Sequence, residues 1–307
     1  MYNGIINIYK EKGFTSFDVV AKLRGILHQR KIGHTGTLDP EAEGVLPVCL
    51  GNGTGLCALL TDRDKEYEAV MRLGITTDTQ DMTGTVLREH PVAVSEGELQ
   101  RAIQSFVGAY DQIPPMYSAL KQNGQKLYEL ARRGIVVDRP ARRVTIHEIQ
   151  VLRVALPLVT MRVRCSKGTY IRTLCEDIGN MLGCGGCMES LLRTSVAQFT
   201  LENAYRLRDV EQAAADGRLD DLIAGADTLF PDYRKVHPAD AAAERGLANG
   251  NRLSATQLGV AAEWVCMPEY QFVRVYGTDG RFMAVYGLEP DCASGSMYKP
   301  VKMFLPE

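Results

Sequence analysis

Residues 33–50 of this chain read GHTGTLDPEAEGVLPVCL, and they are its most informative stretch. Glycines at positions 33, 36 and 44 allow the backbone to approach a ligand closely, and they surround a single aspartate, Asp39. The apolar residues at 45–50 then predict a buried strand. An aspartate fixed on a glycine-rich loop of this kind is suited to act as a nucleophile or as an electrostatic stabiliser.

The same stretch also fits the start of a helix. Asp39 would be the N-cap and Pro40 the first helical residue, while Glu41 and Glu43 would favour the positive end of the helix dipole. An isolated Asp-Pro pair is more often a cap than a catalytic site. The glycines and His34 nearby favour the catalytic interpretation, although one aspartate could both cap a helix and contact a ligand.

The size and composition of the chain indicate a soluble globular protein. Its 307 residues suit two domains, and 45% of them are hydrophobic and 23% charged. No run approaches the 18 or so apolar residues of a membrane-spanning helix, and the N-terminus lacks the basic-then-apolar order of a signal peptide. We therefore expect a cytoplasmic protein that does not bind a membrane, and we expect a monomer because nothing indicates an obligate oligomer.

The net charge of −2 argues mildly against nucleic-acid binding, but the basic residues are clustered. Residues 121–143 contain seven Lys or Arg against two acidic residues, and residues 153–172 contain five Lys or Arg and no acid. Such clusters suit phosphate groups, and they are equally compatible with solvated faces. The C-x-x-C pair of Cys184 and Cys187 has no second pair at zinc-site spacing, so we expect no metal.

Apolar periodicity predicts a mixture of strands and helices. Strands are expected at 5–9, 45–50, 65–73, 144–154 and 159–165. Helices are expected after Thr15 or Ser16, after a capping box that begins at Ser95, and over 171–182. Together these segments indicate an α/β protein.

Two further regions differ from this pattern. Residues 110–143 are punctuated by proline and glycine and predict a long excursion from the core with one short helix at 127–132; excursions of this length are usually functional or disordered. Residues 231–238 resemble a linker. Beyond it, Thr278-Asp279-Gly280 separates two apolar runs and predicts a β-hairpin, so we expect a small β-rich domain after about residue 235.

Residues 166–172, SKGTYIR, form a second candidate site at a predicted turn from strand to helix. Arg172 can bind a carboxylate through two hydrogen bonds, whereas Lys167 is a mobile point charge. Tyr170 could stack on an unpaired base. An ordinary turn with a core tyrosine and a surface arginine is the alternative. Tyr67, in the strand at 65–73, is by periodicity alone more typical of a half-buried sheet residue than of a catalytic one.

Several motifs, taken together and in this order, resemble those of the TruB family of bacterial tRNA pseudouridine synthases. They are KGFTS at 12–16, residues 33–51, KEY at 65–67, TDTQD at 77–81, PPMYSALK at 114–121 and KGTYIR at 167–172. The resemblance spans nearly the whole chain. It implies an α/β (α+β) catalytic domain at 1–235 with a central, mostly antiparallel sheet, a thumb-like RNA-binding insertion at 110–143, and a small β-rich PUA-like RNA-binding domain at 236–307.

The resemblance also implies the catalytic residues. Asp39 matches the catalytic aspartate of the family, and Arg172 matches the arginine that pairs with it. Tyr67 matches the tyrosine that stacks on the target uracil and takes part in proton removal at C5.

Five further residues are expected to serve substrate binding. His34 matches the histidine that fills the space left by the flipped base, and Tyr170 and Leu191 match residues that line the uracil pocket. Lys12 resembles a structural or backbone-contacting lysine near that pocket, and Lys167 is expected to bind the substrate. The chain departs from the family at Gly55 and at Cys187, where many relatives carry Lys and His.

The activity implied by the resemblance is conversion of the uridine at position 55, in the T-loop of tRNA, to pseudouridine. The N1–C1′ bond breaks, the base turns over, and C5 joins C1′. Because the change involves neither redox chemistry nor an added atom, we expect no cofactor. The expected partner is the T-arm of tRNA.

Two alternatives remain: a guide-RNA-dependent pseudouridylase subunit and a non-catalytic tRNA-binding or tRNA-folding protein. The thumb-like insertion favours a stand-alone enzyme, since the guide-dependent relatives lack a comparable one.

Overall fold

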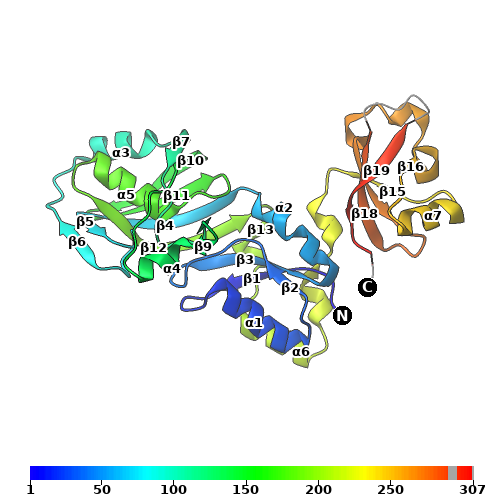
Figure 1. Cartoon of the computed structure of the whole chain (residues 1–307), viewed down its shortest axis with the longest axis horizontal. Coiled ribbons are helices and arrows are strands. Elements are labelled where there is room, and N and C mark those ends of the chain that lie inside the picture. Colours follow the sequence, from blue (N-terminus) through cyan, green and yellow to red (C-terminus); the bar gives the residue numbers. More distant parts are fainter. Residues whose placement is uncertain (290–295, 306–307) are drawn as a thin grey trace.

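The computed structural model describes residues 1–289 and 296–305. Its strands form one ten-stranded sheet, one five-stranded sheet and two small two-stranded sheets. Figure 1 shows an elongated molecule in which the five-stranded sheet lies at one end, apart from the large sheet. The two small sheets are β5 with β6, and β8 with β9.

The large sheet runs in the order β14-β1-β3-β12-β4-β11-β10-β7, with β2 added to β3 and β13 added to β12. Its strands are β1 Gly4–Lys10, β2 Ile32–His34, β3 Glu43–Leu50, β4 Lys65–Leu73, β7 Gly108–Gln112, β10 Arg142–Ala155, β11 Leu158–Cys165, β12 Gly186–Val196, β13 Phe199–Thr200 and β14 Ile223–Ala224. Every pair is antiparallel except β3 with β12. The expectation of a mixed α/β fold around a mostly antiparallel central sheet is confirmed.

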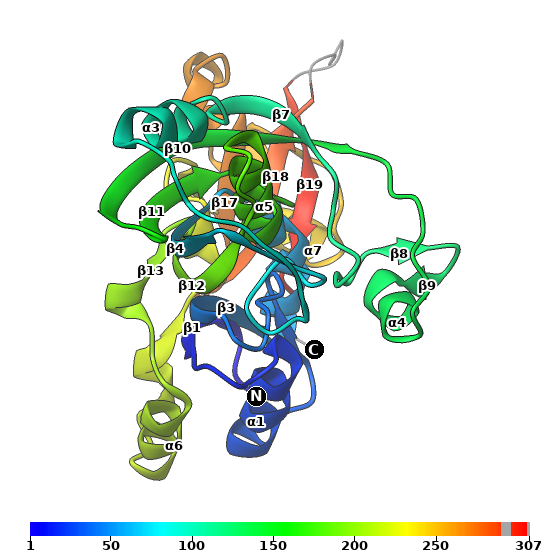
Figure 2. The ribbon, with the colours of Figure 1, turned by 90° about the vertical axis from the view of Figure 1, so that its left-hand side faces the viewer.

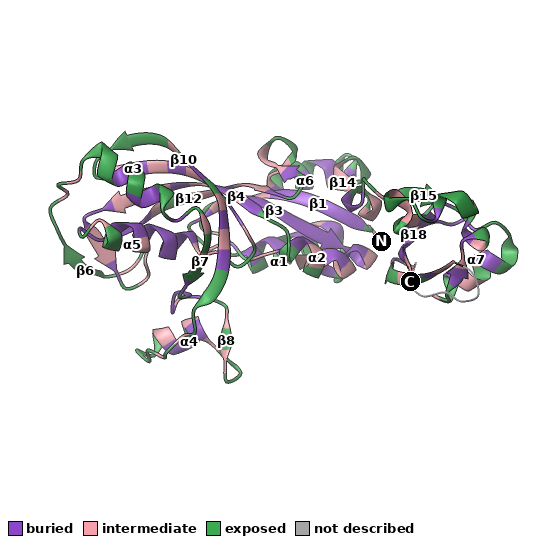
Figure 3. Ribbon diagram, turned by 90° about the horizontal axis from the view of Figure 1, so that it is seen from above, coloured by how far each residue is buried: buried purple, intermediate pink, exposed green. Residues whose placement is uncertain are grey.

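The burial pattern of a strand depends on whether one or both of its faces are covered by other parts of the protein. In β4 alternate residues are buried, because one face of this part of the sheet meets the core and the other meets solvent. In β3 seven of eight residues are buried. Leu46 and Val48 pack with α1 (Ser16–Leu27) on one face, while Val45 and Cys49 pack near α2 (Cys57–Thr61) on the other. Figure 3 shows this burial of β1 and β3.

Two helices begin at the caps that the sequence predicts. Thr15 caps α1 and Ser95 caps α3 (Glu96–Gln104), each with a reciprocal carboxylate in a capping box. The remaining helices are α4 Leu127–Arg132, α5 Ile171–Met181, α6 Leu207–Ala215 and α7 Ala241–Ala248. Helix α5 crosses the sheet and buries Ile171, Leu174 and Ile178 in the core shared with β4 and β11.

Residues 113–141 leave the large sheet between β7 and β10. They contain β8 Lys121–Gln122, β9 Gln125–Lys126 and α4, whose range is the one expected from the sequence. Met116, Leu127 and Leu130 form a small core of their own. Figure 2 shows this excursion projecting from the body of the molecule.

The C-terminal sheet has the order β15-β17-β18-β19-β16. Its strands are β15 Arg234–Val236, β16 Leu253–Ser254, β17 Phe272–Tyr276, β18 Phe282–Leu288 and β19 Met297–Met303, and the other small strands are β5 Ile75–Thr77 and β6 Val86–Glu89. The expected hairpin is β17–β18. Residues 290–295 and 306–307 of the predicted domain at 236–307 lie outside the described residues.

The Asn52 side chain donates to the Phe304 carbonyl over 2.9 Å, which links the two sheets.

Candidate active site

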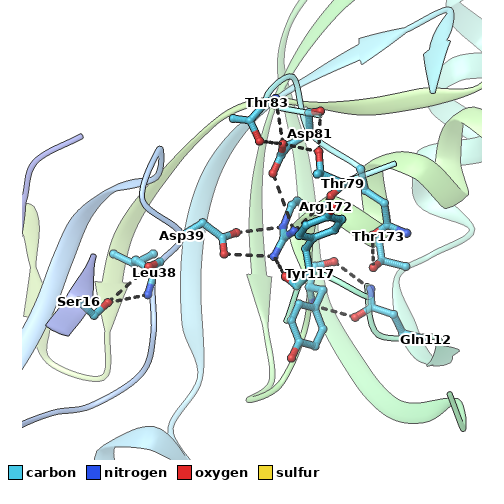
Figure 4. Close-up of polar contacts among 12 residues, drawn as sticks. Ser16, Leu38, Asp39, Thr79, Asp81, Thr83, Gln112, Tyr117, Arg172 and Thr173 are labelled. Atoms are coloured by element: carbon cyan, nitrogen blue, oxygen red, sulfur yellow. Dashed lines mark hydrogen bonds and ion pairs between the residues drawn. The ribbon is translucent and has the colours of Figure 1, made fainter. Parts of the chain in front are cut away.

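Asp39 and Arg172 form a two-point ion pair. Arg172 Nη2 donates to Asp39 Oδ1 over 3.1 Å, and Arg172 Nε lies 2.9 Å from Asp39 Oδ2. This is the fork geometry in which a guanidinium holds a carboxylate most firmly. The Arg172 side chain is 5% exposed, whereas that of Asp39 is 36% exposed. The carboxylate is therefore bound by a buried guanidinium and is itself still accessible to solvent. Figure 4 shows the two side chains facing each other.

The loop that carries Asp39 is a turn, so the expectation of a helix N-cap at this residue is wrong. The Ala42 N–H donates to the Asp39 carbonyl over 3.1 Å, and no helix follows. Ser16 Oγ accepts from the Leu38 N–H over 2.9 Å, which ties the loop to the start of α1. A side chain at Gly44 would lie 2.2 Å from the Arg193 carbonyl, so this position requires glycine.

Arg172 is itself held by several acceptors. It donates to the Tyr117 carbonyl over 2.9 Å and to the Thr79 carbonyl over 3.2 Å, and it lies 3.8 Å from Asp81 Oδ2. Asp81 accepts in turn from the hydroxyls of Thr79 and Thr83 over 2.7 and 2.6 Å. The site reasoning from sequence missed Asp81. The available signal was an aspartate flanked by threonines, a pattern typical of a turn that fixes a carboxylate.

Neighbouring groups and burial shift the pKa of Asp39 in opposite directions. Burial raises the pKa of Asp39 above that of an ordinary aspartate, and the positive charge of Arg172 counteracts this effect. The Asp81 carboxylate raises the Asp39 pKa further, whereas Lys10 lowers it. Arg172 is therefore the main group that favours an ionised Asp39.

Tyr67 lies on β4, almost completely buried, directly opposite Arg193 on β12. Burial raises the Tyr67 pKa, while the positive charge of Arg193 lowers it. Sequence reasoning did not single out Arg193. A lone arginine in the run LLRTSV at 191–196 normally indicates an outward-facing position, and only the packing shows that it is buried.

Three of the expected substrate-binding residues lie around this site. Leu191 packs against the cluster that contains Leu38 and Tyr67. Tyr170 precedes α5, and its backbone exchanges two hydrogen bonds with the buried Gln112 side chain, over 2.8 and 3.0 Å. His34 ends β2, and its Nδ1 is buried without a partner in the structure. Burial, and secondarily the charge of Arg193, lower the His34 pKa and favour neutral imidazole.

The two expected lysines are exposed and form ion pairs. Lys12 pairs over 3.1 Å with Glu41, which lies on the Asp39 loop, and its role in substrate binding stays a prediction. The lysine that contacts the protein backbone next to this loop is Lys10: it is 0% exposed and donates to the Phe14 and Pro40 carbonyls over 2.6 and 3.1 Å. The reason is that β1 turns Lys10 inward, whereas Lys12 follows the strand. Lys167 forms an exposed ion pair with Asp62 over 2.9 Å, and its role in substrate binding stays a prediction.

The basic cluster at 153–172 is not a free cationic surface. Arg162 lies 2.7 Å from Glu68 on β4, and Arg164 lies 3.8 Å from Glu148 on β10. These acids come from neighbouring strands, so the sequence segment alone did not reveal the neutralisation. Within the described part of the chain, no group of three or more His, Cys, Asp or Glu could hold a metal, and no helix is long and apolar enough to cross a membrane.

Comparison with known proteins identifies the family. The model of the N-terminal domain of TruB family pseudouridylate synthases matches residues 24–171, and that of the tRNA pseudouridylate synthase B C-terminal domain matches residues 172–230. The tRNA pseudouridine synthase B of Lachnoclostridium phytofermentans is 52% identical, with 99% of this chain and 100% of that protein covered. That of Bacillus pumilus is 40% identical, with 99% and 98% covered.

Solved structures agree with this result. A Cbf5–Nop10–Gar1 complex contains a chain with a TM-score of 0.72 and 27% identity, covering 99% of this chain and 85% of that one. An H/ACA RNP bound to a substrate RNA containing 2′-deoxyuridine gives a TM-score of 0.71 and 25% identity over the same shares. The fold and these relatives are those of pseudouridine synthases, which are isomerases. Within that class, the chain belongs to the TruB family of tRNA pseudouridine synthases.

Proposed function

We propose that this chain converts the uridine at position 55 in the T-loop of tRNA to pseudouridine, with Asp39 as the catalytic carboxylate. The observation that carries the proposal is the two-point pair of Asp39 and Arg172, which prepares an accessible carboxylate on a buried guanidinium. Its membership of the TruB family supports tRNA as the substrate.

The proposed reaction begins with extrusion of the stacked uridine, which costs a few kcal/mol. Neutral His34 offsets part of this cost by filling the vacated space, and Tyr170 and Leu191 line the pocket that receives the uracil. Asp39 then acts as an anion on the electron-poor centre created as the N1–C1′ bond breaks. Tyr67 stacks on the base and serves the removal of the C5 proton after C5 has joined C1′.

We assign the excursion at 113–141, which lies within the insertion expected at 110–143, to RNA binding as a thumb that holds the T-arm. Its support is geometric: it has its own small core, projects from the body and carries clustered Lys and Arg. Lys126 and Arg132 both lie over the ring of Tyr128, which presents a cationic and aromatic surface of the kind that binds RNA. The domain at 236–307 is proposed as a second, PUA-like contact with RNA. We further propose that the enzyme acts in the cytoplasm as a monomer.

A guide-RNA-dependent subunit is the second candidate, because the solved neighbours are components of complexes named Cbf5–Nop10–Gar1 and H/ACA RNP. Relatives with 40–52% identity over nearly the full chain are instead named tRNA pseudouridine synthase B. This higher similarity favours a stand-alone enzyme.

The test is release of tritium from a T-arm stem-loop that contains C5-labelled uridine, with the purified chain and no other protein or RNA. We expect one tritium released per stem-loop, and none when the uridine at position 55 is replaced by cytidine. The Asp39→Asn variant should bind the stem-loop and release no tritium. Binding without release by the unmodified chain would support the non-catalytic alternative, and release only with an added guide RNA would support the guide-dependent one.

A further inference from the structure

Arg193 is a buried cation. It lies on β12 between β3 and β4 and is 1% exposed. Within the described residues, no ion pair joins it to an aspartate or glutamate. Burying a charge without a partner of opposite sign costs folding free energy. The groups to which Arg193 donates hydrogen bonds therefore indicate why the protein keeps an arginine here.

The Arg193 guanidinium holds the catalytic loop on both sides of Asp39. Its Nε donates to the Val45 carbonyl over 2.7 Å, and its Nη2 donates to the Gly36 carbonyl over 3.4 Å. A Cβ built on Gly36 would lie 3.7 Å from Arg193 Nη1, which places the guanidinium directly against the loop. One side chain therefore contacts the residues that precede and follow the turn of Asp39.

Tyr67 is the neighbour of Arg193 on the adjacent strand. Residues 193 and 67 are direct partners in the pairing of β12 with β4, so their side chains lie next to each other on the sheet. The positive charge of Arg193 lowers the Tyr67 pKa, which burial raises. The guanidinium that holds the Asp39 loop is therefore also the cross-strand neighbour of Tyr67.

We propose that Arg193 is a positioning residue that sets Tyr67 and the Asp39 loop at a fixed separation, because it donates to Gly36 and Val45 and is the direct cross-strand partner of Tyr67. The inference rests on the proposed function, because it assumes that Asp39 and Tyr67 act on the uridine. Arg193 itself does not touch the substrate. A guanidinium suits this task because its planar fork can reach several acceptors, whereas the ammonium of lysine is a point charge.

The experiment compares Arg193→Gln and Arg193→Lys in the full chain, with Arg72→Gln as the matched control. Arg72 lies on β4, the strand of Tyr67, but pairs with Glu189 on the outer face. Single-turnover tritium release and stem-loop affinity are measured at a temperature at which melting curves show all variants folded. We expect both Arg193 variants to lose about a hundredfold in rate, as a misplacement of about 1 Å can cost, with affinity within about threefold of the unmodified chain. The Arg72→Gln control should keep the rate and the stem-loop affinity of the unmodified chain.

A second measurement asks whether Arg193 acts through Tyr67. Tyr67→Phe removes only the phenol oxygen. If Arg193 acts partly by placing that oxygen, Arg193→Gln should lower the single-turnover rate by a clearly smaller factor in the Tyr67→Phe variant than in the unmodified chain. Such a difference is the signature of coupled residues. The proposal would be overturned if Arg193→Gln lowered the rate by the same factor in both backgrounds. It would also be overturned if the Arg193 variants lost only stem-loop affinity, kept the full rate, or both failed to fold.

The outcomes also separate this inference from the proposed function. If the unmodified chain releases no tritium, the proposed function fails. If the unmodified chain is active and Asp39→Asn is not, but the Arg193 variants keep the full rate, only the positioning role fails.

Discussion

Arg172 contacts both carboxylate oxygens of Asp39, although the two residues are 133 positions apart in the chain. The arginine is buried and bound to the Tyr117 and Thr79 carbonyls, so it cannot move away from the aspartate without breaking other hydrogen bonds. The pair therefore provides a pre-organised carboxylate, which is the form in which electrostatic groups are most effective in catalysis.

Arg172→Lys should not behave as a conservative change. A lysine can reach one carboxylate oxygen but cannot reproduce the two parallel contacts, nor can it also satisfy the carbonyls. We expect the single-turnover rate to fall on the order of a hundredfold, while the affinity for a T-arm stem-loop changes little. Rapid-quench measurement of tritium release, with filter binding as the control, tests this. A full rate in the variant would show that two-point pairing is not required.

Lys10→Met should destabilise the protein more than Lys12→Met. Lys10 donates to three backbone carbonyls, and its removal leaves buried acceptors without partners, at a cost of about 1–3 kcal/mol or more. Lys12 forms an exposed pair with Glu41, for which about 0–1 kcal/mol is expected. Urea denaturation of both variants measures the free energies of unfolding, and equal losses would contradict the assignment of Lys10 as the structural lysine.

Asp177→Asn should stabilise the protein at neutral pH. Burial raises the pKa of Asp177 to about 6, from 3.8, so the folded protein binds this proton more tightly than the unfolded chain does. The ionised carboxylate therefore costs free energy above pH 6, and the cost disappears as the pH falls through 6 toward 4. A fully buried group would cost about 3 kcal/mol for such a shift, and partial exposure reduces the expected gain to about 1 kcal/mol.

The measurement for Asp177 is thermal unfolding of both proteins between pH 4 and pH 8. The variant should have the higher melting temperature at pH 8, and the difference should be lost near pH 4. A difference that does not depend on pH would mean that the carboxylate is not desolvated.

Replacing residues 121–137 with a short Gly-Ser linker should weaken tRNA binding and leave the fold intact. These residues pack with one another and with Met116, Tyr117 and Leu120 in the small core, and the segment that contributes the Tyr117 carbonyl to Arg172 is kept. We expect an increase in the tRNA dissociation constant of about tenfold or more and a smaller slope in its salt dependence, since phosphate contacts are removed. The melting temperature is the control, and unchanged binding would argue against a thumb.

Local signals in the sequence determined much of the architecture. The caps at Thr15 and Ser95, the alternation in β4, the short helix at 127–132 and the hairpin β17–β18 all depend on residues within a few positions of one another. The order of the short motifs was enough to identify the family. The division at residue 235 and the catalytic roles of the site residues stay predictions.

Only the tertiary structure decided which charges are buried and which are neutralised. The sequence alone did not show that Lys10 rather than Lys12 turns inward, that acids on β4 and β10 neutralise Arg162 and Arg164, or that Arg193 lies beneath the Asp39 loop. Most of these contacts join segments that are distant in the chain: Lys10 and Pro40 are 30 positions apart, Arg162 and Glu68 are 94 apart, and Arg193 and Gly36 are 157 apart. Their register is set by the packing of the whole sheet, because a slip of one residue would turn every side chain of a strand to the opposite face.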